Sequence, residues 1–281
     1  ENLIFGNGSD ELIDVILKTL LGPGAEIVTS DATFVEYKIC GAINGFVVKA
    51  VPLADFTFDL KAIKNAITDK TKAVFIANPN NPTGTYVNAS AVEAFLDSIP
   101  PDILVVFDEA YTEYVDARDF PDMSRYLNKN NVAILRTFSK IYGLAGLRIG
   151  YMIASEEFIA CCERVRQPFN VNALAQVAAI AALDDKAFVA RSQKTNKQQK
   201  KVLCAALKKM GIWFKESQTN FLFVKMNPAL QDVFGRLLRQ GIIVRDMKMY
   251  KDTGYARITI GTKKENARLI RALQDMTKET L

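Results

Sequence analysis

The sequence predicts an α/β fold in which a mostly parallel β-sheet is covered by helices on both faces and is followed by a smaller α+β part. Near-continuous apolar runs of strand length alternate with amphipathic segments, which is typical of parallel sheets that are buried on both faces. After about residue 165 the pattern changes to long helical stretches, and short strand and helix segments follow them. These two observations indicate two structural parts of different size.

The first predicted element is a helix over residues 10–20, where apolar side chains recur at helical spacing until Gly22-Pro23-Gly24 ends the pattern. A glycine-rich segment begins at Gly6, directly before this helix. Almost nothing precedes that segment to form a leading strand or helix, and the chain has no initiating Met. We therefore expect residues to be missing at the N-terminus.

The next predicted elements alternate between strand and helix. Short apolar runs predict strands over residues 26–29, 46–51, 73–77, 103–107, 132–136 and 149–153. Amphipathic segments between them predict helices over residues 33–45, 59–67 and 88–98, the second of them capped by Asp59.

The C-terminal part is predicted to be richer in helix. The helices are expected over residues 173–183, 186–210, 228–240 and 264–276, and the strands over residues 221–225, 242–245 and 256–260. We predict a large domain over residues 1–184 and a small C-terminal domain over residues 185–281.

The composition excludes several kinds of chemistry. The 281 residues include no histidine, which excludes Ser-His-Asp and Cys-His catalysis and histidine-ligated metal sites. The four cysteines match neither a disulfide framework nor a zinc spacing. Acid–base work therefore falls to Lys, Tyr, Asp or Glu, and no metal site is expected.

The net charge of +5 comes from lysines on amphipathic segments, which indicates solvated helix faces rather than a nucleic-acid surface. No apolar run approaches the ~20 residues needed to span a bilayer, and the first residues lack the layout of a signal peptide. We expect a cytoplasmic protein that binds neither nucleic acid nor membrane.

Polar motifs follow successive predicted strands. In open α/β sheets, ligands bind outside the carboxyl ends of the strands. Each of these motifs alone is ordinary turn or cap chemistry, but together they indicate one site at one rim of the sheet. They are Asn78-Pro79-Asn80-Asn81-Pro82-Thr83-Gly84, Asp108-Glu109-Ala110-Tyr111 and Thr137-Phe138-Ser139-Lys140, with Arg148 eight residues further on.

In this order the motifs resemble those of the fold-type-I pyridoxal-phosphate enzymes, over the whole chain. The resemblance is closest to the histidinol-phosphate aminotransferase family, and it extends to Gly8-Ser9-Asp10-Glu11, Arg136-Thr137-Phe138-Ser139-Lys140, Gly143-Leu144-Ala145-Gly146-Leu147-Arg148 and Ile243-Val244-Arg245-Asp246. It implies the PLP-dependent transferase fold type I, with pyridoxal 5′-phosphate as cofactor. It also implies amino transfer between histidinol phosphate and 2-oxoglutarate in histidine biosynthesis, by a homodimer with both active sites at its interface.

The resemblance implies roles around the cofactor ring. Lys140 matches the lysine that forms the Schiff base and then moves the proton on the substrate carbon. Asp108 matches the carboxylate that keeps the pyridinium nitrogen protonated, so that the ring accepts electrons. Tyr111 and Asn81 match the pair that hydrogen-bonds the ring's 3-oxygen. Phe34 falls where the family has an aromatic ring on the pyridine face, although it could instead be a core residue.

The cofactor phosphate needs N–H donors and positive charge. A helix N-terminus supplies oriented N–H groups, and Ser9 and Asp10 begin the first predicted helix. The Ser139 hydroxyl and the Arg148 guanidinium match the family's other phosphate contacts, since arginine can bind an anion through two hydrogen bonds.

Two arginines are the expected substrate contacts, together with Asn81. Arg257 matches the arginine that clamps the anionic end of the substrate, and Arg245 adds a second cation nearby. Two arginines suit a phosphate dianion better than a single carboxylate, which favours histidinol phosphate. Arg245 could instead be a surface residue that pairs with Asp246.

Other functions stay open. An aromatic or aspartate-type aminotransferase and a threonine-phosphate decarboxylase share the scaffold, and only the decarboxylase would release carbon dioxide. An effector-sensing domain would need an attached DNA-binding helix-turn-helix, which the chain lacks. The family's N-terminal arm, whose tyrosines help to close the active site, has no counterpart here, so an inactive fragment is a further alternative.

Overall fold

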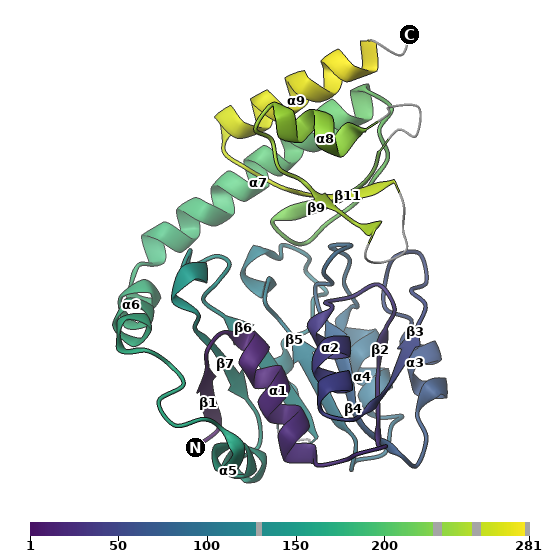
Figure 1. Ribbon diagram of the computed structural model, residues 1–281, viewed down its shortest axis with the longest axis vertical. Coiled ribbons are helices and arrows are strands. Elements are labelled where there is room, and N and C mark those ends of the chain that lie inside the picture. The colour runs from purple at the N-terminus through teal and green to yellow at the C-terminus, as the bar shows by residue number, and fades with distance from the viewer. Residues whose placement is uncertain (128–130, 227–231, 249–253, 279–281) are drawn as a thin grey trace.

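The computed structural model describes residues 1–127, 131–226, 232–248 and 254–278. It contains two separate β-sheets, a larger one in the lower half of Figure 1 and a smaller one above it. The helix α7 (Lys186–Lys209) runs from the lower half into the upper half. The division into domains at residues 184 and 185 stays a prediction.

The larger sheet has the strand order β1-β7-β6-β5-β4-β2-β3. The five strands from β6 to β3 are parallel, whereas β7 runs antiparallel to both β6 and β1. This confirms the predicted α/β class with a mostly parallel sheet. The strands are β1 (Leu3–Gly6), β2 (Glu26–Ser30), β3 (Val47–Val51), β4 (Thr71–Ala77), β5 (Leu104–Asp108), β6 (Val132–Thr137) and β7 (Gly150–Ile153).

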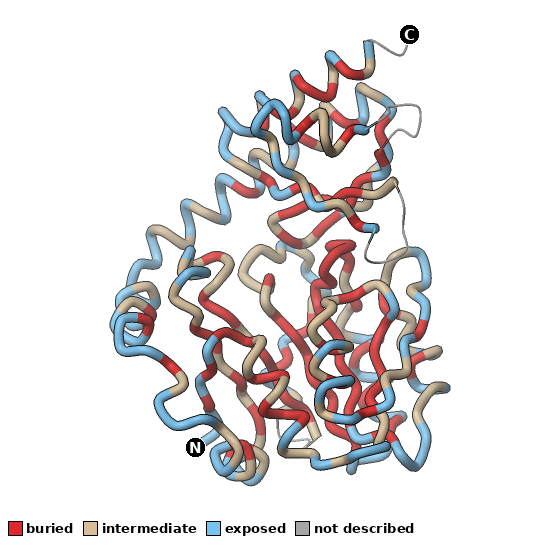
Figure 2. Tube along the Cα trace, viewed as in Figure 1, coloured by how far each residue is buried: buried red, intermediate tan, exposed pale blue. Residues whose placement is uncertain are grey.

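Helices cover the larger sheet and bury its central strands. Every residue of β5 is buried, and the strand interiors are red in Figure 2. Helix α1 (Ser9–Leu20) contacts α2 (Glu36–Ile43) and α5 (Glu156–Val165), while α3 (Leu60–Ala66) contacts α4 (Ala89–Leu96). Asp59 caps α3 as expected, because its side chain accepts a hydrogen bond from the N–H of Ala62.

The C-terminal half contains α6 (Ala173–Asp184), α7 and a four-stranded sheet of order β10-β11-β9-β8. Its strands are β8 (Phe214–Lys215), β9 (Phe221–Lys225), β10 (Arg245–Asp246) and β11 (Tyr255–Thr259). The helices α8 (Val233–Arg239) and α9 (Lys263–Lys278) pack with α7 over a second apolar core. Residues 228–231 of the predicted helix 228–240 lie outside the described residues. Within the described part of the chain, no helix combines the length and hydrophobicity needed to cross a membrane.

Three expectations about individual elements were wrong, and one helix was missed. Residues 3–6 do form a leading strand, β1, because they gain hydrogen bonds from β7, far away in the sequence. Helix α2 begins at Glu36 rather than at residue 33, and it ends before Gly45, whose φ of 77° is left-handed. The strand expected over residues 242–245 is shorter and lies later, because only β10 (Arg245–Asp246) is paired there. Helix α5 was not expected at all.

Candidate active site

The carboxyl edge of the larger sheet brings the predicted site residues together. Ala77, Asp108 and Thr137 end the parallel strands β4, β5 and β6. Since β7 is antiparallel, its first residue, Gly150, pairs with both Thr137 and Gly6 at this same edge. Arg148 lies two residues before β7 and Ser9 lies three residues after β1, so both reach the rim that Asp108 and Lys140 reach from the neighbouring strands.

A cavity of about 110 Å³ lies at this rim. Eight of the eleven predicted site residues line it, from six different segments of the chain: Ser9, Phe34, Asn81, Asp108, Tyr111, Ser139, Lys140 and Arg148. Asp10, Arg245 and Arg257 do not line it, although Asp10 and Arg257 contact residues that do.

Asp108 presents a buried carboxylate to this cavity. Its Oδ2 accepts a hydrogen bond of 2.6 Å from the Tyr37 hydroxyl, and its Oδ1 accepts one of 3.0 Å from the N–H of Ala110. Burial raises the pKa of Asp108, while these two hydrogen bonds and the positive charge of Lys140 act against the increase. The carboxylate is therefore shielded from solvent, and its two hydrogen-bond donors favour its charged form.

Lys140 and Tyr111 both line the cavity, and the lysine amine lies over the tyrosine ring. The Lys140 Nζ lies 5.3 Å from the centre of the Tyr111 ring. That ring packs edge-on against Phe221 of β9, with 5.1 Å between the ring centres, so the smaller sheet supports it. The turn after Lys140 is closed by a hydrogen bond from the N–H of Gly143, which has a left-handed φ of 73°, to the Lys140 carbonyl. The amine thus lies beside Tyr111, and the backbone of Lys140 is part of a hydrogen-bonded turn.

Arg148 makes part of the cavity wall cationic. Arg148 donates from Nη1 to the Ser139 hydroxyl at 3.4 Å and from Nη2 to the Asp10 carboxylate at 2.8 Å. Gly8 has a φ of 80°, and a Cβ there would lie 2.3 Å from Arg148 Nη2, so the backbone needs glycine at this approach. The start of α1 at Ser9 adds unpaired helix N–H groups beside the guanidinium. Such a set of donors suits an anion.

Arg257 and Arg245 lie on the smaller sheet, above the rim. Arg257 donates from Nη1 to Oδ1 of Asn81, which lines the cavity, and its guanidinium carbon lies 5.1 Å from the centre of the Phe221 ring. The buried Nε of Arg257 has no hydrogen-bond partner among the described residues. Arg245 is exposed, and it lies opposite Arg257 in the backbone register of β10 and β11. Asp246 forms an ion pair of 3.3 Å with Lys248.

The family model of the aminotransferases of class I and II matches residues 1–273. The chain belongs to this aminotransferase family. Histidinol-phosphate aminotransferase of Moorella thermoacetica is 46% identical over 278 residues, which cover 98% of this chain and 72% of that protein. The enzyme of the same name from Halalkalibacterium halodurans is 44% identical over 100% of this chain and 76% of its own length.

The crystal structure of histidinol-phosphate aminotransferase from Sinorhizobium meliloti, in complex with pyridoxal-5′-phosphate, has the same fold as this aminotransferase. The TM-score is 0.92 at 29% identity, and the match covers 100% of this chain and 77% of that one. The fold predicted from the motifs is therefore confirmed at the level of the family.

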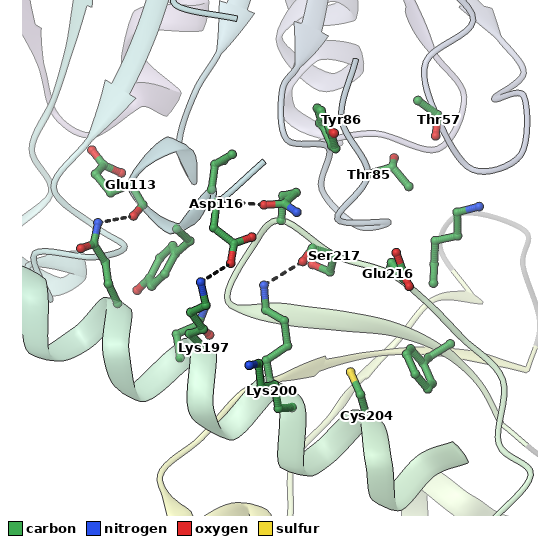
Figure 3. A pocket seen from close by; sticks show the side chains of 18 residues that line it. Thr57, Thr85, Tyr86, Glu113, Asp116, Lys197, Lys200, Cys204, Glu216 and Ser217 are labelled. Atoms are coloured by element: carbon green, nitrogen blue, oxygen red, sulfur yellow. Dashed lines mark hydrogen bonds and ion pairs between the residues drawn. The ribbon is translucent and has the colours of Figure 1, made fainter. Parts of the chain in front are cut away.

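A larger cavity of this aminotransferase, of about 760 Å³, lies away from these residues (Figure 3). Several of the polar side chains that line it already have partners in the protein. Lys197 of α7 forms an ion pair of 3.0 Å with Asp116, and Lys200 donates to the Ser217 carbonyl at 2.7 Å. Burial also raises the pKa of Glu113, at its margin, to about 7. The ion pair between Lys197 and Asp116 joins the two halves, whereas eight of the predicted site residues line the smaller cavity.

Sequence reasoning missed Tyr37, which contacts Asp108, and the ion pair of 2.8 Å between the buried Glu109 and the half-buried Arg136. Both pairs join residues that are more than 25 positions apart in the sequence. The sequence did offer a signal for the pair of Glu109 and Arg136, because Glu109 is adjacent to Asp108 and Arg136 belongs to the motif that ends at Lys140. For Tyr37 the only signal was its position three residues after Phe34, a spacing that puts two side chains on the same face of a helix.

Proposed function

We propose that this aminotransferase binds pyridoxal 5′-phosphate through Lys140 and transfers the amino group of histidinol phosphate to 2-oxoglutarate, in histidine biosynthesis. The observation that carries the proposal is the single cavity that joins a lysine amine, a buried carboxylate and an arginine at the carboxyl edge of the sheet. The similarity to two histidinol-phosphate aminotransferases at 46% and 44% identity supports the substrate. The expected cytoplasmic location belongs to the same proposal.

The residues around the cavity fit this cofactor. Asp108 ends β5, and Arg148 precedes β7, two strands away. Both side chains line the same cavity, the carboxylate from the end of one strand and the guanidinium from the segment before another. Lys140 follows β6, the strand between them. An acid for a ring nitrogen, an amine for an aldehyde and a cation for a phosphate thus come from three successive strand ends and line one cavity.

When bound, pyridoxal phosphate supplies an electron sink for the carbon that bears the amino group. The residues of this chain would hold the sink and move the proton. The Asp108 carboxylate would accept a hydrogen bond from the ring N–H and favour its protonated form. Phe34 would cover one face of the ring, and Tyr111 and Asn81 would donate to the ring's 3-oxygen. The Lys140 amine would take the proton from the substrate carbon and return it at the neighbouring atom.

The phosphate of the cofactor would lie at the cationic part of the cavity wall. Arg148 and the Ser139 hydroxyl would bind it directly, and the N–H groups at Ser9 and Asp10 would add donors from the start of α1. The Asp10 side chain would act through its ion pair with Arg148, since a carboxylate cannot donate to a phosphate.

Substrate anions would bind near Arg257. A buried guanidinium N–H without a partner is uncommon, and its unused Nε supports an anionic ligand at this position. Asn81 would link this site to the cofactor, because it accepts a hydrogen bond from Arg257 and lines the cavity. Arg245, opposite Arg257 in the strand register, would add the second charge that a phosphate dianion requires.

The test of this function is glutamate formation from 2-oxoglutarate by the cofactor-loaded protein with four amino compounds. We expect kcat/KM for histidinol phosphate to exceed that for phenylalanine and aspartate by at least about a hundredfold. Faster turnover of either amino acid would contradict the proposed substrate. Carbon dioxide released from O-phosphothreonine would indicate a decarboxylase, and bound cofactor without any turnover would indicate a sensing domain.

We also propose that a second copy of this chain covers α6. This helix exposes four apolar side chains at regular spacing, with relative exposures of 75% for Leu174, 68% for Val177, 66% for Ile180 and 52% for Leu183. Phe169, at 98%, extends the patch. Apolar surfaces of this kind mark protein interfaces, and identical subunits most often form twofold dimers.

Light scattering at micromolar concentration is expected to give the mass of two chains. Ile180→Asp should lower it to the mass of one chain, because a carboxylate buried in an apolar interface loses its hydration. The matched control is Val202→Asp on α7, a residue that is 50% exposed outside the patch, and it should leave the mass unchanged. A single-chain mass for the unaltered protein would refute the dimer.

A further inference from the structure

Tyr37 contacts the carboxylate of Asp108 but does not line the cavity. Its side chain belongs to α2 and is fully buried, with a relative exposure of 0%. The hydroxyl donates to Oδ2 of Asp108 at 2.6 Å. Asp108 lines the cavity and Tyr37 does not, so any effect of Tyr37 on a ligand passes through another side chain.

The ring of Tyr37 is fixed on two sides. It stacks on Phe75 of β4, with 5.1 Å between the ring centres and an interplanar angle of 23°. It also meets Phe34 edge-on, at 5.7 Å and 84°. Tyr37 therefore contacts both Phe34 and Asp108, the two residues expected at the face and at the nitrogen of the cofactor ring.

We propose that Tyr37 is a positioning residue that holds the Asp108 carboxylate ionised and correctly oriented for a ring nitrogen. The inference rests on the proposed cofactor, but the contact between Tyr37 and Asp108 does not. Tyr37 would thus contribute to recognition of the cofactor ring although it does not line the cavity.

The hydrogen-bond geometry supports this role. A carboxylate oxygen accepts up to two hydrogen bonds, so Asp108, held by Tyr37 at Oδ2 and by Ala110 at Oδ1, keeps a free position on each oxygen for a ring N–H. Burial, followed by the charge of Asp108, raises the pKa of Tyr37 well above its usual value. The hydroxyl therefore keeps its proton and is the donor in this pair. Without it, burial would favour a neutral Asp108 that cannot stabilise a pyridinium.

The decisive measurement compares two ligands on the protein freed of cofactor. Equilibrium titration gives dissociation constants for pyridoxal phosphate and for its 1-deaza analogue, in which a C–H replaces the ring nitrogen. The unaltered protein is expected to prefer the nitrogen-containing compound. In Tyr37→Phe, which keeps the ring and its stacking, this preference should fall by about tenfold or more, because a hydrogen bond to a charged group is lost.

Equal weakening of both ligands, with the preference unchanged, would overturn the proposal, since a purely structural role predicts that result. Tyr37→His, which keeps a ring and an N–H donor, should recover part of the preference, and failure to do so would also count against it. In the Asp108→Asn background, Tyr37→Phe should have no further effect on the preference; a full additional loss would mean that Tyr37 acts elsewhere.

The matched control is Tyr86→Phe. The Tyr86 hydroxyl donates to Oδ1 of Asp119 at 2.7 Å, so it forms the same kind of pair outside the cavity around Lys140. Its loss should leave the preference unchanged. If the unaltered protein binds neither compound, or both equally, the proposed function fails. If it discriminates between them and Tyr37→Phe discriminates equally well, only the role of Tyr37 fails.

Discussion

Lys140→Ala is expected to remove the visible absorbance of the lysine-linked cofactor and to lower turnover by at least about a thousandfold. Lys140 is the lysine among the residues that line the cavity with Asp108, and its amine lies beside Tyr111. Alanine removes both the covalent link and the group that moves the proton. Cofactor binding should weaken but persist, because Arg148 and Asp108 remain.

The measurement is an absorbance spectrum, followed by borohydride reduction and mass spectrometry of the peptides. In the unaltered protein the cofactor mass should be attached to the peptide that contains Lys140. Lys197→Ala is a suitable control, since Lys197 lies in the larger cavity and pairs with Asp116. A chromophore that borohydride still reduces in Lys140→Ala would remove Lys140 from the mechanism.

Asp108→Asn should leave the cofactor bound while turnover falls by about a hundredfold to a thousandfold. The amide has nearly the same size and can still accept a hydrogen bond from Tyr37 or Ala110, so the fold is preserved. It carries no charge, however, and therefore cannot hold the ring nitrogen in its protonated form. The loss should appear in kcat more than in KM, because ring protonation matters most when the electron pair is accepted.

The control for this substitution is Asp119→Asn, which changes an exposed carboxylate that also accepts a tyrosine hydrogen bond. Its rates should match those of the unaltered protein. Near-normal turnover in Asp108→Asn would mean that another group, or none, holds the ring nitrogen.

The sequence predicted much of the larger sheet because its strands are buried on both faces. Strands such as β4 and β5 are apolar throughout, and residues that end parallel strands must meet at one edge, which is why Asn81, Asp108 and Lys140 could be placed together. Local patterns with a cap, such as α3 after Asp59, were also predictable.

Features that depend on a distant partner could not be predicted. Strand β1 has four residues and exists through its pairing with β7, about 150 positions away. Helix α2 begins at Glu36, and the Thr33 hydroxyl instead donates to Asn80, a partner 47 positions away. From the sequence, Tyr37 is indistinguishable from an ordinary core aromatic residue, and only the structure shows that its hydroxyl donates to Asp108. The side chain of Asp10 could not be assigned to Arg148 from its position in the first helix alone.

The most direct test of the central claim is a single-turnover absorbance experiment on the cofactor-loaded protein without 2-oxoglutarate. Histidinol phosphate, added at micromolar concentration, is expected to convert the band of the lysine-linked cofactor to that of its amino form, and phenylalanine and aspartate should do so far more slowly. A band that no amino donor converts would contradict the account, because a lysine, a carboxylate and an arginine gathered in one cavity would then serve a purpose other than amino transfer.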